Sequence, residues 1–150
     1  IKSFLSMNEK ITVWHGTTNK DIELFYPLSH FGTIDSAMAR VENKDSIFYK
    51  CEINPKGFIS IQDYGNETDC FPKDLLIQKI LTHEEYIKLP LSLYKKDIFQ
   101  WRSIFQNILL SKNIHGFKYI NVAKSSGDTS YIVVNPCMID IIYKCTNPSI

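Results

Sequence analysis

The pattern of apolar and polar positions predicts strands towards both ends of the chain. The β-branched and aromatic run Ile11–Trp14 is typical of a strand, and it is followed by the glycine- and threonine-containing segment His15–Thr18. We therefore expect this strand to end in a loop at His15. Further strand-like runs cover Ser46–Ile53, Gly57–Ile61, Phe117–Asn121, Ser130–Val134 and Met138–Tyr143.

The middle of the chain carries the helical patterns. Thr33 is typical of a helix N-cap, Pro72 of the first turn of a second helix, and Thr82–Glu85 has the form of a capping box. A longer apolar repeat at intervals of three and four residues predicts one helix over about Leu93 to Lys112, with Trp101 in the core.

This order of elements favours an α+β fold. Regular alternation of strand and helix, which builds a parallel sheet, is missing, so we expect a mostly antiparallel or mixed sheet with helices concentrated in the middle of the chain. The length of 150 residues suits one domain covering residues 1–150.

Charge and composition exclude several classes of partner. Lys and Arg number 17 against 16 Asp and Glu, a net charge of +1, so a broad basic surface for nucleic acid is not expected. No apolar stretch is long enough to span a membrane, and the first residues have no signal-peptide core. We expect a soluble monomer, located in the cytoplasm or acting as a secreted effector.

Cysteine usage and common motifs narrow the chemistry further. No Cys-x-x-Cys pair or zinc-finger spacing occurs, so no metal site is expected. Cys51, Cys137 and Cys145 lie in apolar runs that are typical of buried thiols. Glycine-rich nucleotide loops, the Gly-x-Ser-x-Gly elbow and the His-Glu-x-x-His helix are all absent from the sequence.

After these exclusions, two segments that contain histidine remain as candidates for a functional site. His15 stands beside Gly16 and a threonine, and His30 lies in Ser29–Thr33, directly before a predicted helix. Each histidine alone is typical of a hydrogen-bonded residue at a strand end. Together with the turn at Asp63–Gly65, they predict a cleft built where strands end.

These segments resemble the ADP-ribosyltransferase fold family. The resemblance also rests on Ala37 and Arg40 and on the closing runs Gly116–Asn121 and Ser130–Val134. It is strongest to the bacterial and phage branch related to the diphtheria-toxin and poly(ADP-ribose) polymerase clade, and it covers about Trp14 to Ile142. The resemblance implies a split, twisted antiparallel β core that binds NAD, the substrate, in a cleft.

The family also implies roles for residues of this chain. His15 would hydrogen-bond the ribose hydroxyls, the backbone of Gly16 would hold the nicotinamide carboxamide, and His30 or Phe31 would pack on the nicotinamide ring. The remaining implied cleft residues are Thr17, Thr33, Ser36, Asp63 and Tyr64.

One expected residue is missing. Family members usually carry a Glu before the fifth core strand, where its carboxylate steadies the positive charge of the transition state. The last Glu here is Glu85; depending on register, Lys124 or Ser130 takes the expected position, and the loop between them offers Asp128. A lysine 4 Å from the oxocarbenium centre would oppose the reaction by about 1 to 4 kcal/mol.

Three functions follow from this pattern. The leading one is a mono-ADP-ribosyltransferase that modifies a protein acceptor, as a bacterial effector or toxin, with His15, His30 and one of Lys124, Asp128 or Ser130 as catalytic residues. An alternative is a catalytically inactive module of the same fold that binds NAD, ADP-ribose or another nucleotide. A third is an RNA 2′-phosphotransferase-like enzyme, in which Lys124 and the histidines bind phosphate.

Overall fold

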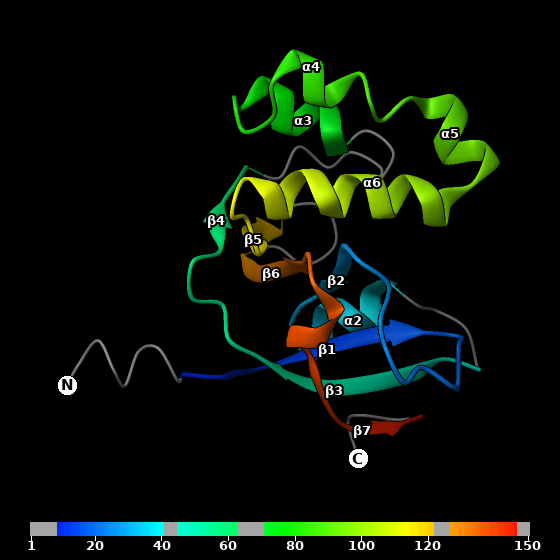
Figure 1. Ribbon diagram of the computed structural model, residues 1–150. Coiled ribbons are helices and arrows are strands. Elements are labelled where there is room, and N and C mark those ends of the chain that lie inside the picture. Colours follow the sequence, from blue (N-terminus) through cyan, green and yellow to red (C-terminus); the bar gives the residue numbers. More distant parts are fainter. Residues whose placement is uncertain (1–8, 41–44, 63–70, 122–126, 147–150) are drawn as a thin grey trace.

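The strands form two sheets, shown in the computed structural model of Figure 1, which describes residues 9–40, 45–62, 71–121 and 127–146. The first sheet is antiparallel and has the order β1-β3-β7; the second has the order β2-β6-β5-β4, in which only the β4–β5 pairing is parallel. The strands of the first sheet are β1 (Ile11–Thr17), β3 (Ile47–Ile53) and β7 (Asp140–Cys145). Those of the second are β2 (Ser29–Phe31), β4 (Ile59–Ser60), β5 (Gly116–Asn121) and β6 (Asp128–Val133).

Most of the helices cover one side of the second sheet. In Figure 1, α3 to α6 lie on that side, and the first sheet lies on the other. None of the helices within the described ranges is long and apolar enough to cross a membrane. The helices are α2 (Ile34–Arg40), α3 (Phe71–Ile77), α4 (His83–Tyr86), α5 (Leu91–Lys96), α6 (Ile98–Ser111) and the 3-10 turn η2 (Pro136–Met138). The α+β class is confirmed, whereas the ADP-ribosyltransferase-like core stays a prediction.

Two apolar cores hold the three layers together. Trp101, Phe105 and Leu109 recur every four residues on α6, are buried, and pack with Phe117 and Ile132 of the second sheet. The expected core position of Trp101 is therefore confirmed.

The second core lies between the two sheets. Val13, Tyr49 and Cys51 of the first sheet pack with Phe31 and Val133 of the second. Because Ile132 faces the helices and Val133 faces the first sheet, alternate residues of β6 supply the two cores.

The three cysteines that the structure describes differ in burial. Cys51 is buried as expected, and burial raises the pKa of its thiol to about 12. The expectation for Cys137 is wrong, because η2 turns this residue outward and leaves it exposed. Cys145 is half-buried on the edge strand β7.

The predicted helix starts are confirmed, but the segment predicted as one long helix forms two helices, α5 and α6. Thr33 Oγ1 accepts the Ser36 N–H at the start of α2, and the Thr82–Glu85 capping box forms at α4. Between α5 and α6, Asp97 leaves the helical conformation (φ −153°, ψ 87°) and its side chain accepts the Gln100 N–H. An Asp side chain that satisfies a free N–H favours a new helix start over continuation, which explains the break.

Several strands differ from the predictions, and three differences affect the account of the site or the C-terminal strand. β1 does not end before His15 but continues to Thr17, because β3 pairs with it along its whole length, His15 opposite Tyr49. The Ser29–Phe31 segment, to which no strand was assigned, forms β2 against β6. The last strand begins at Asp140 rather than Met138, since η2 occupies the preceding residues.

Candidate functional site

The two sheets meet where the two histidine segments lie. Trp14 on β1 and Gly32 after β2 form an isolated antiparallel bridge. The Trp14 N–H donates to the Gly32 carbonyl at 2.8 Å, and the Gly32 N–H donates to the Trp14 carbonyl at 3.0 Å. This bridge sets the segment that begins at His15 beside the segment that contains His30.

His15 is held in one orientation by this arrangement. Its Nδ1 lies 2.7 Å from the carbonyl oxygen of His30, and because a carbonyl can only accept, Nδ1 carries the proton and donates it. In the neutral ring the acceptor lone pair is then on Nε2. Phe25 packs edge-on against the imidazole, with ring centroids 5.0 Å apart.

A small pocket, partly open to solvent, lies at the bridge. Gly32 makes room for it: a Cβ at this position would lie 3.2 Å from both Ser130 Oγ and Ser36 Cβ. The residues that line the pocket are Trp14, His15, Gly16, His30, Phe31, Gly32, Ser36, Ala37 and Ser130.

Ser36 is the unusual member of this lining. It is only 2% exposed, and its hydroxyl is buried without a hydrogen-bond partner among the residues that the structure describes. A buried hydroxyl normally finds a partner, and leaving one unpaired costs about 1 to 3 kcal/mol. Ser36 Oγ is therefore an unsatisfied polar group on one of the residues that line the pocket.

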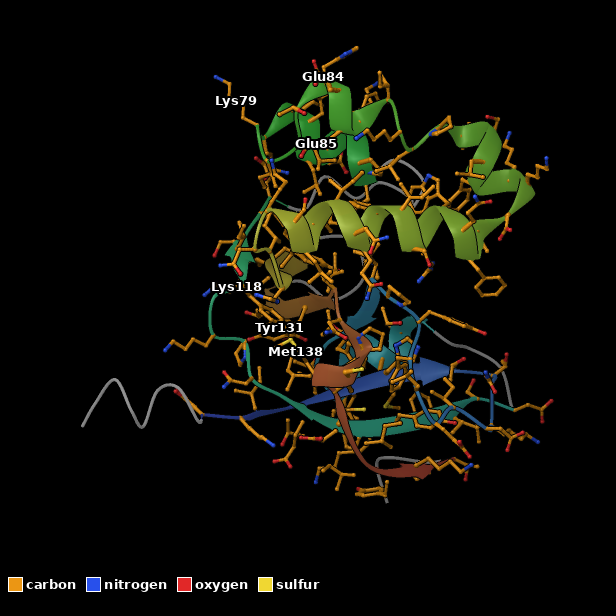
Figure 2. The ribbon with its side chains drawn as sticks, in the orientation of Figure 1. Lys79, Glu84, Glu85, Lys118, Tyr131 and Met138 are labelled. Atoms are coloured by element: carbon orange, nitrogen blue, oxygen red, sulfur yellow. The ribbon has the colours of Figure 1, made fainter. Side chains whose placement is uncertain are left out.

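In the register that places Ser130 at the position of the missing Glu, this position lines the pocket, whereas Lys124 lies outside the described residues. β6 begins at Asp128, whose Oδ2 accepts the Thr33 hydroxyl at 2.9 Å, and Ser130 is buried two residues later. Residues two apart in a strand point to the same face, so both side chains lie on the pocket side of β6. The last glutamates of the chain, Glu84 and Glu85, lie on α4 in the helical layer, away from the two sheets (Figure 2).

The structure brings part of the predicted site together. His15, Gly16, His30, Phe31, Ser36 and Ser130 line one pocket, and the Thr33–Asp128 contact lies at its edge. Phe31 is 2% exposed and packs with Phe25, so of the two predicted stacking residues His30 is the more accessible. Thr17 does not line the pocket; its hydroxyl accepts the Asn19 N–H in the following turn. Asp63, Tyr64 and Lys124 lie outside the described residues.

Sequence reasoning missed several neighbours of this site. Trp14 was assigned only to the strand, although it forms the bridge, and Ala37 was given no role in the cleft, although both line the pocket. Phe25 covers the ring of His15, and Tyr119 contacts His30 across 89 residues of sequence. The apolar run that contains Tyr119 marked it as a strand residue, and no local signal indicated its partner.

Comparisons with known proteins leave the family of the chain open. No protein-family model matches the sequence. No curated protein matches it either. Among solved structures, one that is described as the crystal structure of an anti-CRISPR protein aligns over 91% of this chain and 98% of its own, with 8% identity and a TM-score of 0.43. A likeness at this score supports no conclusion about the fold or function of this chain.

Proposed function

We propose that the chain is an NAD-dependent mono-ADP-ribosyltransferase acting on a protein acceptor. The observation that carries the proposal is the buried hydroxyl of Ser36, which has no hydrogen-bond partner among the described residues and shares a pocket with both histidine segments. A carboxamide, as in nicotinamide, can both donate to and accept from such a hydroxyl. The proposal therefore assigns the nicotinamide end of NAD to this pocket.

The geometry of His15 supports the same assignment. With Nδ1–H donating to the His30 carbonyl, the neutral ring has an acceptor on Nε2, which suits a ribose hydroxyl. The pocket is small, so we assign only one end of the dinucleotide to it, with the rest of the ligand outside.

The proposed reaction moves one glycosyl unit. The bond between ribose C1′ and the nicotinamide nitrogen breaks, and its electron pair leaves with nicotinamide. A nucleophilic side chain of the acceptor then bonds to C1′ and loses its proton. The intervening state is oxocarbenium-like, and a nearby carboxylate stabilises it more than it stabilises bound NAD. Asp128, tied to the edge of the pocket through Thr33, is the carboxylate we assign to this task.

A binding module without turnover is the second candidate. The observation that favours it is the absence of any Glu after Glu85, combined with the position of that residue on α4. Asp128 has a shorter side chain than Glu and is engaged by Thr33. If it does not approach the ribose, NAD or ADP-ribose would bind without transfer.

One pair of measurements separates these functions. Calorimetric titration with NAD tests binding, and incubation of the purified chain and a lysate with tagged NAD tests transfer. We expect binding and labelling by the wild-type protein and loss of both in His15→Ala. His83→Ala, which removes an exposed imidazole on α4, is the matched control and should behave as wild type.

The outcomes differ for each function. Binding without labelling supports the module. Absence of both in a folded wild-type protein overturns the NAD proposal. Transfer of the 2′-phosphate from a 2′-phosphorylated RNA to an acceptor, measured separately, favours the phosphotransferase.

A further inference from the structure

A chain of contacts leads from β5 to the pocket. The hydroxyl of Tyr119 lies 3.2 Å from Nδ1 of His30, and the two rings meet nearly edge to face, with centroids 6.4 Å apart. The carbonyl of His30 in turn accepts the Nδ1–H of His15 at 2.7 Å. Tyr119 is thus connected to both histidines, through the side chain of one and its backbone to the other.

The aromatic ring of Tyr119 is packed in the core between α6 and the second sheet. Its side chain is only 9% exposed and belongs to the cluster between α6 and the second sheet. Phe117, two residues earlier, and Ile132 opposite it are part of the same cluster. Tyr119 pairs with Ser130, which lines the pocket. On the face of the second sheet that packs against α6, the row of apolar side chains therefore ends at the hydroxyl of Tyr119.

A phenol hydroxyl is suited to hold an imidazole at this point. It can donate to Nδ1 when that atom carries a lone pair, or accept from it when that atom carries a proton. The contact is therefore kept in either protonation form of the ring. A phenylalanine would preserve the packing of the ring and remove the contact with Nδ1 of His30.

We propose that Tyr119 is a positioning residue for the pocket: its hydroxyl fixes the ring of His30, and the ordered β2 backbone then presents the carbonyl that orients His15. The inference rests on the proposed function, because it concerns the binding of NAD at the same pocket. It adds a residue from β5, a strand to which sequence reasoning assigned no part of the site.

The test compares Tyr119→Phe with a matched variant, Tyr131→Phe. Tyr131 lies opposite Lys118 on the same strand pair, but faces the first sheet, where it packs with Phe58 (Figure 2). Both variants lose one phenol hydroxyl from the second sheet. Two quantities are measured for each: the imidazole ¹⁵N signals of His30 without ligand, and the dissociation constant of NAD.

We expect Tyr119→Phe to move the His30 signals and to weaken NAD binding by about two- to tenfold, the loss of one net hydrogen bond. Tyr131→Phe should leave both unchanged. A Tyr119→Phe protein that matches wild type in both quantities overturns the inference, as does an equal loss of binding in both variants. If wild type binds no NAD, the proposed function fails and the role of Tyr119 in binding falls with it, while the His30 signals still decide whether the contact exists.

Discussion

The unpaired hydroxyl of Ser36 leads to a prediction in which stability and binding change in opposite directions. In Ser36→Ala the buried oxygen is removed, and with it the cost of desolvating a hydroxyl that has no partner within the described structure, about 1 to 3 kcal/mol. Alanine is also the better helix former inside α2, by up to about 0.5 kcal/mol. Some packing around the oxygen is lost.

The expected net effect is a rise of about 1 to 2 kcal/mol in the free energy of unfolding. For a chain of this length, that corresponds to roughly 2 to 8 °C in the thermal midpoint. The same substitution should weaken NAD binding by about two- to tenfold, because the ligand loses one hydrogen bond. The Thr33 cap of α2 should be unaffected, since it uses the backbone N–H of Ser36.

The assay is chemical denaturation together with calorimetric titration of NAD. Ser29→Ala is the matched control: Ser29 is also buried, but its hydroxyl donates to the Tyr26 carbonyl at 2.6 Å. That variant should lose about 0.5 to 1.5 kcal/mol of stability, the opposite sign. A Ser36→Ala protein that is destabilised like Ser29→Ala would show that the Ser36 hydroxyl already has a partner, and the reasoning would fail.

Two further predictions concern the pocket wall and the helical layer. Gly32→Ala should abolish measurable NAD binding while the far-ultraviolet circular dichroism stays that of wild type. The new Cβ would lie 3.2 Å from Ser130 Oγ and Ser36 Cβ, in the pocket to which we assign nicotinamide. An unchanged affinity for NAD would contradict this assignment. The second prediction concerns Glu85 on α4. Desolvation raises the pKa of its carboxyl, but hydrogen bonds from the Thr82 N–H and Lys112 outweigh it and lower the pKa below the ordinary value of 4.5. The contribution of Glu85 to stability is therefore present above pH 4.5 and is lost as the pH falls through the lowered pKa. Denaturation curves of wild type and Glu85→Gln should therefore differ at pH 7 and converge in acid, and a gap that stays constant would refute the linkage.

Local chemistry explains which features could be predicted from the sequence. The caps at Thr33 and Thr82 depend on residues three positions apart, and both form as the sequence indicates. The core position of Trp101 follows from helical periodicity over α6. The concentration of helices between β4 and β5 follows from the same local patterns.

Features that depend on distant pairing could not be predicted. β2 has three residues, too few for a strand period to show, and it exists because β6 pairs with it. β1 extends through His15 because β3 continues beside it. At Asp97, periodicity predicted continuity, whereas the side chain capped a new helix.

The candidate site combines both kinds of information. The histidine segments could be found in the sequence, because each stands beside glycine and threonine at the edge of an apolar run. The burial of Ser36 and the contact of Tyr119 with His30 depend on how β5, β6 and α2 meet in space. The sequence left three candidates for the role of the missing Glu, and we propose Asp128 because it contacts Thr33 at the edge of the pocket.

The proposed function depends most on where NAD binds. A crystal structure of the wild-type chain soaked with NAD measures this directly. We expect the nicotinamide carboxamide within hydrogen-bond distance of Ser36 Oγ, with the ribose beside His15 and Asp128. NAD bound elsewhere, or a nicotinamide that leaves Ser36 Oγ unpaired, would contradict it.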